Sequence, residues 1–145
     1  MVDVQIRRAV VDDLPWLATH DPRVPPAERA RKVGAGEVFV AERAGQRVGL
    51  LRLDFLWSKQ AYVSLLYVLE PHRRTGVGKA FLRFLDVHLS GLGCRSLLSS
   101  SQVDEPEPQQ WHRHVGFSEC GVLTGINEGS VGELFFLRRV GDPIP

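Results

Sequence analysis

Apolar residues fall into short runs along the 145-residue chain, separated by glycine, proline and charged turns. Runs typical of strands cover residues 4–10, 37–43, 46–57, 61–69, 94–101, 117–126 and 131–140. Helical spacing covers residues 26–33 and 76–89, and shorter helical patterns follow the acidic residues at 12–13 and 104–105. The predicted order is therefore strand, helix, helix, three strands, helix, strand, helix and two strands. A strand that returns after a helix predicts a right-handed crossover with parallel pairing, so the sheet is expected to be mixed.

The stretch LLYVLEPHRRTGVGKA, residues 65–80, combines a strand pattern, a glycine turn and the start of a helix. Leu65–Leu69 is an apolar run typical of a strand buried on both faces, and Pro71 ends it. Arg73 and Arg74 precede the glycines at which the helical pattern begins. A helix N-terminus leaves about four N–H groups unpaired and carries roughly half a positive charge, which suits an anion. An ordinary strand-to-helix turn is the alternative, and the two arginines favour a phosphate.

Two well-known phosphate loops do not match these residues. A Walker A loop needs a glycine five residues before its Gly-Lys pair and a hydroxyl residue after it. Arg73 and Ala80 stand at those positions around Gly78-Lys79. A dinucleotide fingerprint needs a third glycine three residues after the second, and Phe81 stands there. Neither loop is present.

The spacing Arg-x-x-Gly-x-Gly does fit, with Arg73, Gly76 and Gly78 after a strand that ends near Val68. This motif resembles the acyl-CoA pyrophosphate loop of the GNAT N-acetyltransferase superfamily, and the predicted element order is similar over almost the whole chain. The resemblance implies an α/β (α+β) GNAT fold in a single domain, residues 1–145. Its mixed, mostly antiparallel sheet of about six to seven strands would have helices on both faces and a splay between the fourth and fifth strands.

The segment QQWHRHVGF, Gln109–Phe117, is similar to a second family motif, in which an aromatic-Tyr pair precedes Gly-Phe or Gly-Tyr by three residues. Trp111 takes the aromatic position and His112 takes the position of the tyrosine, which in the family often lies near the CoA sulfur. Histidine has an ordinary pKa of about 6.5 against about 10 for tyrosine, so a neutral ring would serve as hydrogen-bond donor rather than as full acid. A partly exposed helix histidine without a catalytic role is the alternative.

The resemblance also implies a cosubstrate and its contacts. Acetyl-CoA would place its pantetheine and thioester oxygen on backbone amides of Leu66, Tyr67 and Val68, an oxyanion-hole arrangement. Its pyrophosphate would bind the loop residues Arg73, Arg74, Thr75, Gly76, Val77, Gly78 and Lys79.

The acceptor would be a primary amine of a small molecule or peptide, which must lose a proton to react. Carboxylates near strand ends could accept that proton, namely Glu70, Asp54, Asp104 and Glu105. Glu70 is nearest to the loop motif, and a solvated strand-end carboxylate is its alternative interpretation. Residues 19–36 and the Ile126–Val131 turn are the variable segments expected to form the acceptor pocket.

The composition of the chain limits the classes of partner that it is expected to bind. Lys and Arg number 18 against 17 Asp and Glu, a net charge of +1, so no strong field recruits nucleic acid or an anionic membrane. No apolar run approaches a membrane span and the N-terminus lacks a signal-peptide core, so we expect a cytoplasmic protein. Cys94 and Cys120 lie in apolar strand patterns where buried free thiols are common, so no disulfide is required.

No metal is expected. His112 and His114 are two residues apart on a predicted helix and point to different faces, whereas helical zinc pairs use a spacing of four. Two isolated cysteines do not complete a zinc knuckle.

Three functions remain open from the sequence. The first is the acetyltransferase, with a possible homodimer through the last hairpin. The second is a non-catalytic acyl-CoA-binding or sensing module with the same fold, because the tyrosine position is changed and no base is obvious. The third is a structural subunit whose exposed strand edges mediate pairing.

Overall fold

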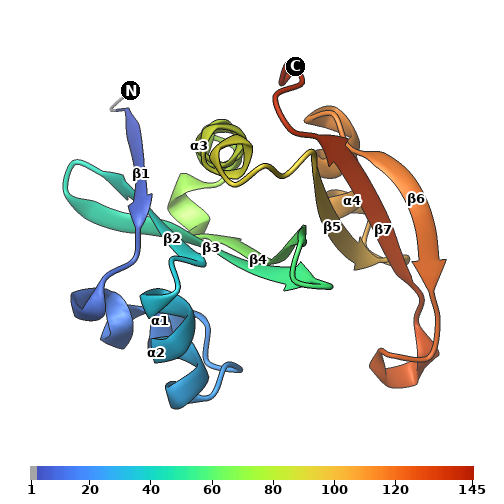
Figure 1. Cartoon of the computed structure of the whole chain (residues 1–145). Coiled ribbons are helices and arrows are strands. Elements are labelled where there is room, and N and C mark those ends of the chain that lie inside the picture. The colour runs from blue at the N-terminus through green and yellow to red at the C-terminus, as the bar shows by residue number, and fades with distance from the viewer. Residues whose placement is uncertain (1–2) are drawn as a thin grey trace. The chain divides into compact units, whose positions relative to one another are not determined.

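Seven strands and four α-helices follow one another in the predicted order in the computed structural model, which describes residues 3–145 (Figure 1). The strands are β1 (Val4–Arg8), β2 (Val38–Arg43), β3 (Gln46–Leu56), β4 (Gln60–Val68), β5 (Ser96–Gln102), β6 (Ser118–Leu123) and β7 (Glu133–Arg139). The helices are α1 (Leu14–His20), α2 (Pro26–Gly34), α3 (Val77–Gly91) and α4 (Pro106–His114), with 3₁₀ turns η1 (Val11–Asp13), η2 (Glu70–His72) and η3 (Glu128–Ser130).

The strands form one sheet in the order β1-β2-β3-β4-β5-β7-β6. Strand β4 pairs with β5 in parallel, whereas β1 with β2, β2 with β3, β5 with β7 and β6 with β7 pair antiparallel. This confirms the predicted mixed, mostly antiparallel sheet and the parallel pairing of the strands on either side of α3. The right-handed sense of that crossover stays a prediction. The parallel register joins Ala61 with Leu97 and Tyr62 with Leu98. The splay between β4 and β5 stays a prediction.

The chain divides into two compact units. The first contains residues up to Leu53 together with Leu65–Leu82, and the second contains Asp54–Ser64 and Arg83–Pro145. The predicted loop and the start of α3 therefore belong to the first unit, and His112 belongs to the second. That the chain is a single domain stays a prediction.

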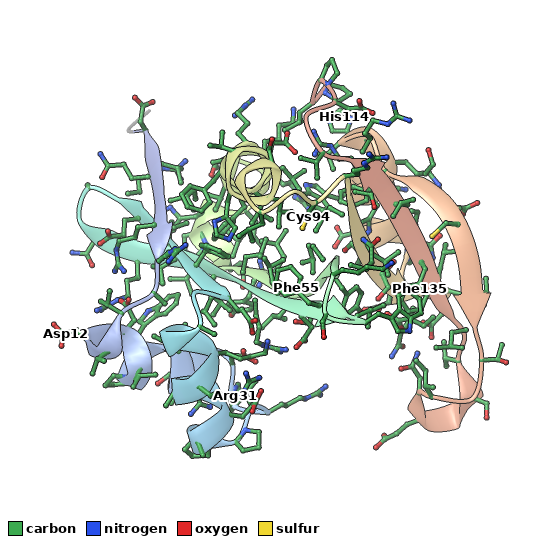
Figure 2. All side chains as sticks on the ribbon, viewed as in Figure 1. Asp12, Arg31, Phe55, Cys94, His114 and Phe135 are labelled. Carbon is green, nitrogen blue, oxygen red and sulfur yellow. The ribbon has the colours of Figure 1, made fainter. Side chains whose placement is uncertain are left out.

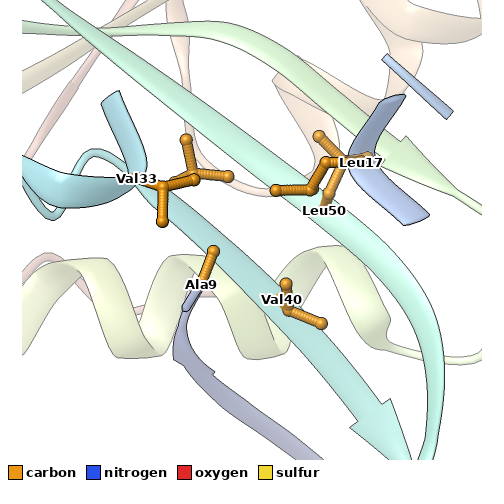
Figure 3. Packing of buried hydrophobic residues seen from close by; sticks show 6 residues of the cluster. Ala9, Leu17, Val33, Val40 and Leu50 are labelled. Atoms are coloured by element: carbon orange, nitrogen blue, oxygen red, sulfur yellow. The ribbon is translucent and has the colours of Figure 1, made fainter. Parts of the chain in front are cut away.

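The core of the first unit packs α1 and α2 against strands β2 and β3. Ala9, Leu17, Val33, Val40 and Leu50 cluster with Val38 in this core, each less than a tenth exposed (Figure 3). Leu14, Trp16, Leu65 and Tyr67 pack against the cluster. Fully burying one such aliphatic side chain contributes about 1.5–3 kcal/mol, so this cluster fixes α1 and α2 against the sheet.

A buried carboxylate closes the first strand-to-helix connection. Asp13 is fully buried, accepts two hydrogen bonds from the Arg7 guanidinium at 2.7 and 2.9 Å, and accepts Arg47 Nε at 2.7 Å. It also accepts the Val10 N–H at 2.7 Å, so its side chain reaches back to the residue before η1. The predicted N-cap at Asp12 or Asp13 is wrong in this detail, because Asp13 precedes α1 without a side-chain cap hydrogen bond to that helix. The Arg7 hydrogen bonds hold the pKa of Asp13 well below its ordinary range. A buried charge is tolerated here because it is paired and fully hydrogen-bonded.

The second unit is built on alternation along β5 and β7. Leu97, Ser99 and Ser101 are buried, and the residues between them are half-buried, so one face of β5 packs inward. Strand β7 has the same alternation, with Leu134 and Phe136 buried. Arg138 is also buried, where its guanidinium donates to both carboxylate oxygens of Asp86 at 2.7 and 2.9 Å.

Four details differ from the sequence-based predictions. Leu65–Leu69 is half-buried rather than buried on both faces, because an apolar run does not reveal how completely neighbouring elements cover it. Cys120 is exposed because β6 is the last strand of the sheet order. Cys94 precedes β5, since its N–H donates to the Leu89 carbonyl and extends the end of α3. Helix α4 begins after Glu105, whose side chain makes no cap hydrogen bond to this helix.

Within residues 3–145, none of the helices combines the length and apolar character that crossing a membrane requires. The described side chains also contain no group of three or more His, Cys, Asp or Glu placed to hold a metal ion.

Candidate active site

The predicted pyrophosphate loop connects β4 to α3 in the first unit. After Val68 the chain makes the η2 turn, and the Leu69 N–H donates to the Val48 carbonyl at 2.8 Å, so the loop starts from a fixed strand end. Gly76 adopts φ +92°, in the left-handed region that glycine enters without steric cost. Arg74 also has a positive φ, +61°, which costs about 1 kcal/mol or more for a residue with a Cβ. The surrounding structure must therefore hold this conformation.

Arg43, at the end of β2, holds the loop from outside the motif. Its Nη1 donates to Thr75 Oγ1 at 3.0 Å and lies 3.1 Å from His72 Nδ1, and its Nη2 donates to the Thr75 carbonyl at 3.3 Å. The Thr75 hydroxyl in turn donates to the His72 carbonyl at 2.5 Å. Hydrogen bonds to a charged donor contribute about 1.5–3 kcal/mol, enough to offset the backbone strain at Arg74. Sequence reasoning missed Arg43, which stands 32 residues before Thr75.

Arg73 lies back along β4. Its Nε donates to the Val68 carbonyl at 2.8 Å, and its guanidinium carbon lies 5.6 Å from the centre of the Tyr67 ring. Across residues 3–145, the terminal nitrogens of this exposed side chain have no protein partner, so they are available to an anion. The Tyr67 ring stacks with His20 at 5.8 Å, and His20 lies 4.5 Å from Trp16, so α1 supports this side of the loop.

The helix that follows presents its N-terminus to the loop. The Ala80 N–H donates to the Gly76 carbonyl at 3.0 Å, which is the first hydrogen bond of the helical series. The N–H groups of the residues before Ala80 therefore have no partner one turn earlier in the helix, and the helix dipole places partial positive charge there. Val77 is buried and Lys79 is half-buried at this end.

Gly49 on β3 sets how closely these parts approach one another. A Cβ at this buried position would lie 3.0 Å from the Tyr67 carbonyl oxygen, 3.4 Å from the Phe81 ring and 3.5 Å from a Val77 methyl. Only glycine lets β4 and the first turns of α3 pack here without displacement. The sequence marks Gly49 only as a glycine within a strand pattern, which is a weak signal of close backbone approach.

His112 lies in the second unit, on α4, and is 5% exposed. Its Nδ1 lies 2.7 Å from the Pro108 carbonyl, which can only accept, so Nδ1 carries the proton and donates. Its Nε2 lies 2.7 Å from Ser99 Oγ and accepts that hydroxyl proton. The ring stacks on Phe136 at 4.4 Å and meets the edge of Phe117 at 5.2 Å. Both ring nitrogens are thus occupied within this unit.

The electrostatics of His112 agree with this geometry. Burial lowers its pKa to about 4, and the nearby Arg113 cation acts in the same direction, whereas the Pro108 carbonyl and Glu133 raise it. The ring is therefore neutral near pH 7. Contact with the CoA sulfur stays a prediction, and it would require the ring to exchange one of its two present partners. The alternative of a non-catalytic helix histidine fits these contacts, although the ring is buried rather than partly exposed.

The four candidate bases occupy different positions. Glu70 is the first residue of η2, beside the loop, and its side chain is exposed. Asp54 is half-buried on β3, and Asp104 and Glu105 are exposed before α4, where Glu105 Oε1 accepts the Gln102 N–H at 3.2 Å. Which of these carboxylates accepts a proton stays a prediction.

Comparison with known proteins gives the family. Residues 34–119 match the family described as "Acetyltransferase (GNAT) domain", more than half of the chain. The chain belongs to the GNAT acetyltransferase family. This confirms the resemblance expected from the loop and the element order.

Individual relatives agree with this assignment. The chain is 32% identical over 93 residues to aminoglycoside N(6')-acetyltransferase type 1 from Stenotrophomonas maltophilia, a match covering 58% of this chain and 61% of that relative. The chain thus spans less than two thirds of the length of that relative.

Two solved structures show the same fold. The fold is similar to Ard1 from Thermoplasma volcanium, with a TM-score of 0.81 and 20% identity over 96% of this chain and 99% of that one. It is also similar to an acetyltransferase from Bacillus anthracis solved in complex with acetyl coenzyme A, with a TM-score of 0.65 and 17% identity over 70% of this chain and 61% of that one.

Proposed function

We propose that this GNAT protein is an acetyl-CoA-dependent N-acetyltransferase that moves the acetyl group directly to a primary amine of a small molecule or peptide. The observation that carries the proposal is the loop after β4, whose conformation Arg43 holds from a separate strand through Thr75 and His72. A loop stabilised in this way ahead of a helix N-terminus is a pre-organised anion site. Membership of the GNAT family indicates which anion binds there, namely the pyrophosphate of acetyl-CoA.

In this proposal the pyrophosphate binds the N–H groups of Arg73–Lys79. The exposed Arg73 guanidinium and the Arg74 and Lys79 side chains add positive charge, since charge-assisted hydrogen bonds to phosphate are about twice as strong as neutral ones. The backbone amides of Leu66, Tyr67 and Val68 receive pantetheine and the thioester oxygen. No metal is part of the mechanism.

The chemistry can proceed without proton donation by His112. The amine must be neutral, the thioester carbonyl must be polarised, and the two reacting groups must be aligned. Alignment alone can contribute effective molarities of about 10⁵ M or more. A thiol with a pKa of about 8.5 leaves as thiolate without full protonation. Glu70 and water at the loop are candidates to remove the amine proton, and His112 remains a candidate for contact with the sulfur.

The relatives support an amine as the class of acceptor, but they do not point to one particular acceptor. The aminoglycoside N(6')-acetyltransferase acts on an amine of a small molecule, and residues 19–36 and the Ile126–Val131 turn are the segments we expect to select the acceptor here. A cytoplasmic location and a homodimer through the last hairpin also stay proposals.

A second function, an acyl-CoA-binding or sensing module without catalysis, is favoured by one observation. The His112 ring is neutral and bonded at both nitrogens, so the residue at the position of the family tyrosine has no free N–H to offer a leaving group. Both functions require acetyl-CoA binding. Only the enzyme releases CoA in the presence of amines.

Two measurements on the full chain test the proposal. Calorimetric titration gives the Kd of acetyl-CoA, and thiol release over a panel of amines and peptide N-termini gives transfer. We expect Arg74→Glu to weaken acetyl-CoA binding by about tenfold or more, since one charge-assisted hydrogen bond is worth about 1.5–3 kcal/mol. Arg95→Glu, which makes the same charge change at an exposed residue of the second unit, is the control. A folded Arg74→Glu variant with unchanged affinity would contradict the proposed pyrophosphate site.

A further inference from the structure

Glu133, the first residue of β7, belongs to a polar group on one face of the second unit. The antiparallel register sets Ser100 opposite Phe135 and Gln102 opposite Glu133. Directly opposed residues point to the same side of a sheet, so these four side chains share a face. Phe135, labelled in Figure 2, marks this face, and all four residues are half-buried.

Neutral donors hold both oxygens of the Glu133 carboxylate. Ser100 Oγ donates to Oε2 at 2.5 Å, and Asn127 Nδ2 donates to Oε1 at 3.0 Å. Because the single Ser100 proton is used in this way, Tyr62, whose hydroxyl lies 2.7 Å from Ser100 Oγ, donates to Ser100. Asn127 also donates to the Val131 carbonyl at 3.0 Å, which fixes the turn before β7. The carboxylate is therefore held in one orientation.

The charge of Glu133 has no partner in the part of the chain that the structure describes. Other shielded carboxylates are matched by cations, as Asp13 is by Arg7, Asp21 by Arg52 and Asp86 by Arg138. Among residues 3–145, the hydrogen bonds of Glu133 come only from a hydroxyl and an amide group. A half-buried carboxylate without a counter-ion attracts a cation.

The surroundings indicate what kind of cation fits. With one carboxylate and no cluster of metal-ligating side chains among residues 3–145, the group lacks the ligands that a divalent metal needs. A primary ammonium needs one anionic acceptor and a few neutral acceptors for its three N–H groups. The Gln102 side chain, opposite Glu133 on the same face, offers an amide oxygen. The Ile126–Val131 turn that Asn127 fixes is one of the segments expected to select the acceptor.

We infer that Glu133 binds the ammonium of the acceptor and accepts its proton, an inference that rests on the proposed N-acetyltransferase function. In this step the ammonium gives one proton to the Glu133 carboxylate, which frees the nitrogen lone pair. The lone pair forms the C–N bond to the thioester carbonyl carbon while the C–S bond breaks. The nitrogen loses its second proton, the CoA thiolate takes up a proton to become the thiol, and the Glu133 carboxyl returns its proton to water.

The test compares acceptors of different basicity in the full chain. A strongly basic alkylamine, with a pKa near the ~10.4 of lysine, is almost entirely ammonium at pH 7, whereas a weakly basic amine is already neutral. Glu133→Gln should lower kcat/KM for the basic amine by about a hundredfold or more, since a positioned base contributes about 10²–10⁴. For the weakly basic amine we expect a loss of about threefold or less, because no proton has to be removed before the nitrogen attacks.

The controls separate this inference from the proposed function. Glu119→Gln removes the same charge from an exposed residue of β6, outside the segments expected to select the acceptor, and should leave kcat/KM for both amines unchanged. Acetyl-CoA should bind Glu133→Gln with a Kd within about twofold of the wild type, since each tenfold change needs about 1.4 kcal/mol. Equal losses for both amines, or no loss, overturn the role of Glu133 while the transferase activity of the wild type stands. A wild type that binds no acetyl-CoA, or acetylates no amine, overturns both.

A second variant covers the case in which Glu133→Gln does not fold. Ser100→Ala keeps the carboxylate but removes the hydroxyl that orients it, so it should show the same selective loss for the basic amine at about tenfold, the value of one hydrogen bond. If a folded Ser100→Ala variant keeps the wild-type ratio of kcat/KM for the two amines, the inference is also overturned.

Discussion

The buried histidine of α4 should make the protein less stable in mild acid. Burial lowers the pKa of His112 to about 4, against about 6.5 for an unfolded histidine. Because the folded state disfavours the proton, this contribution to stability is fully present above pH ~6.5 and is lost as the pH falls toward ~4. The gap corresponds to about 3 kcal/mol, since each pKa unit is worth about 1.4 kcal/mol.

His112→Phe removes the titration and keeps an aromatic ring on Phe136. At neutral pH the variant leaves Ser99 Oγ and the Pro108 carbonyl without this partner, so it should be less stable than the wild type by about 1–3 kcal/mol. Between pH ~6.5 and ~4 the wild type loses about 3 kcal/mol that the variant does not lose. The difference in stability between the two proteins should therefore shrink or reverse in acid.

Urea unfolding at several pH values between ~7 and ~4, followed by tryptophan fluorescence, measures both stabilities. His114→Gln, at an exposed histidine two residues along the same helix, should keep the pH dependence of the wild type. Parallel curves for the wild type and His112→Phe would refute the buried neutral ring. They would also restore His112 as a group that can carry a proton near neutral pH.

Two further changes test how the loop is held. Arg43→Gln should weaken acetyl-CoA binding by about tenfold, because the loop loses a charged donor worth about 1.5–3 kcal/mol. Arg31→Gln, at an exposed residue of α2, should leave the Kd unchanged. Equal affinities of these two variants in calorimetric titration would contradict the role of Arg43. Gly49→Ala should cost about 1–3 kcal/mol, because its Cβ would lie 3.0 Å from the Tyr67 carbonyl, and Gly34→Ala, with open space around the Cβ, should not destabilise. A Tm of Gly49→Ala equal to that of the wild type would show that β4 shifts freely.

Much of the fold could be read from local pattern. Period-two and period-3.6 spacing placed every strand and helix to within a few residues, and glycines and prolines placed the breaks between them. Gly76 was identifiable in the same way as a turn glycine, and the structure adds that its φ is positive. The loop motif and the element order were enough to indicate the GNAT family, and the family match confirmed it.

Exposure was less predictable than the elements themselves. The apolar run Leu65–Leu69 and the thiol of Cys120 were expected to be buried, and both expectations were wrong. Burial depends on which strand lies at the edge of the sheet and on what covers that strand. The spacing of apolar residues along one strand determines neither property.

The sequence by itself determined the elements, their order and the position of the phosphate loop, because these depend on neighbours a few residues away. Only the tertiary structure decided what acts on that loop and which side chains are charged. Arg43 meets Thr75 through the pairing of distant strands, and Gly49 matters because of the carbonyl opposite it. His112 is neutral because burial in the folded second unit lowers its pKa. A hydrogen bond or a pKa depends on distance in space, and only folding brings such partners within about 3 Å of each other.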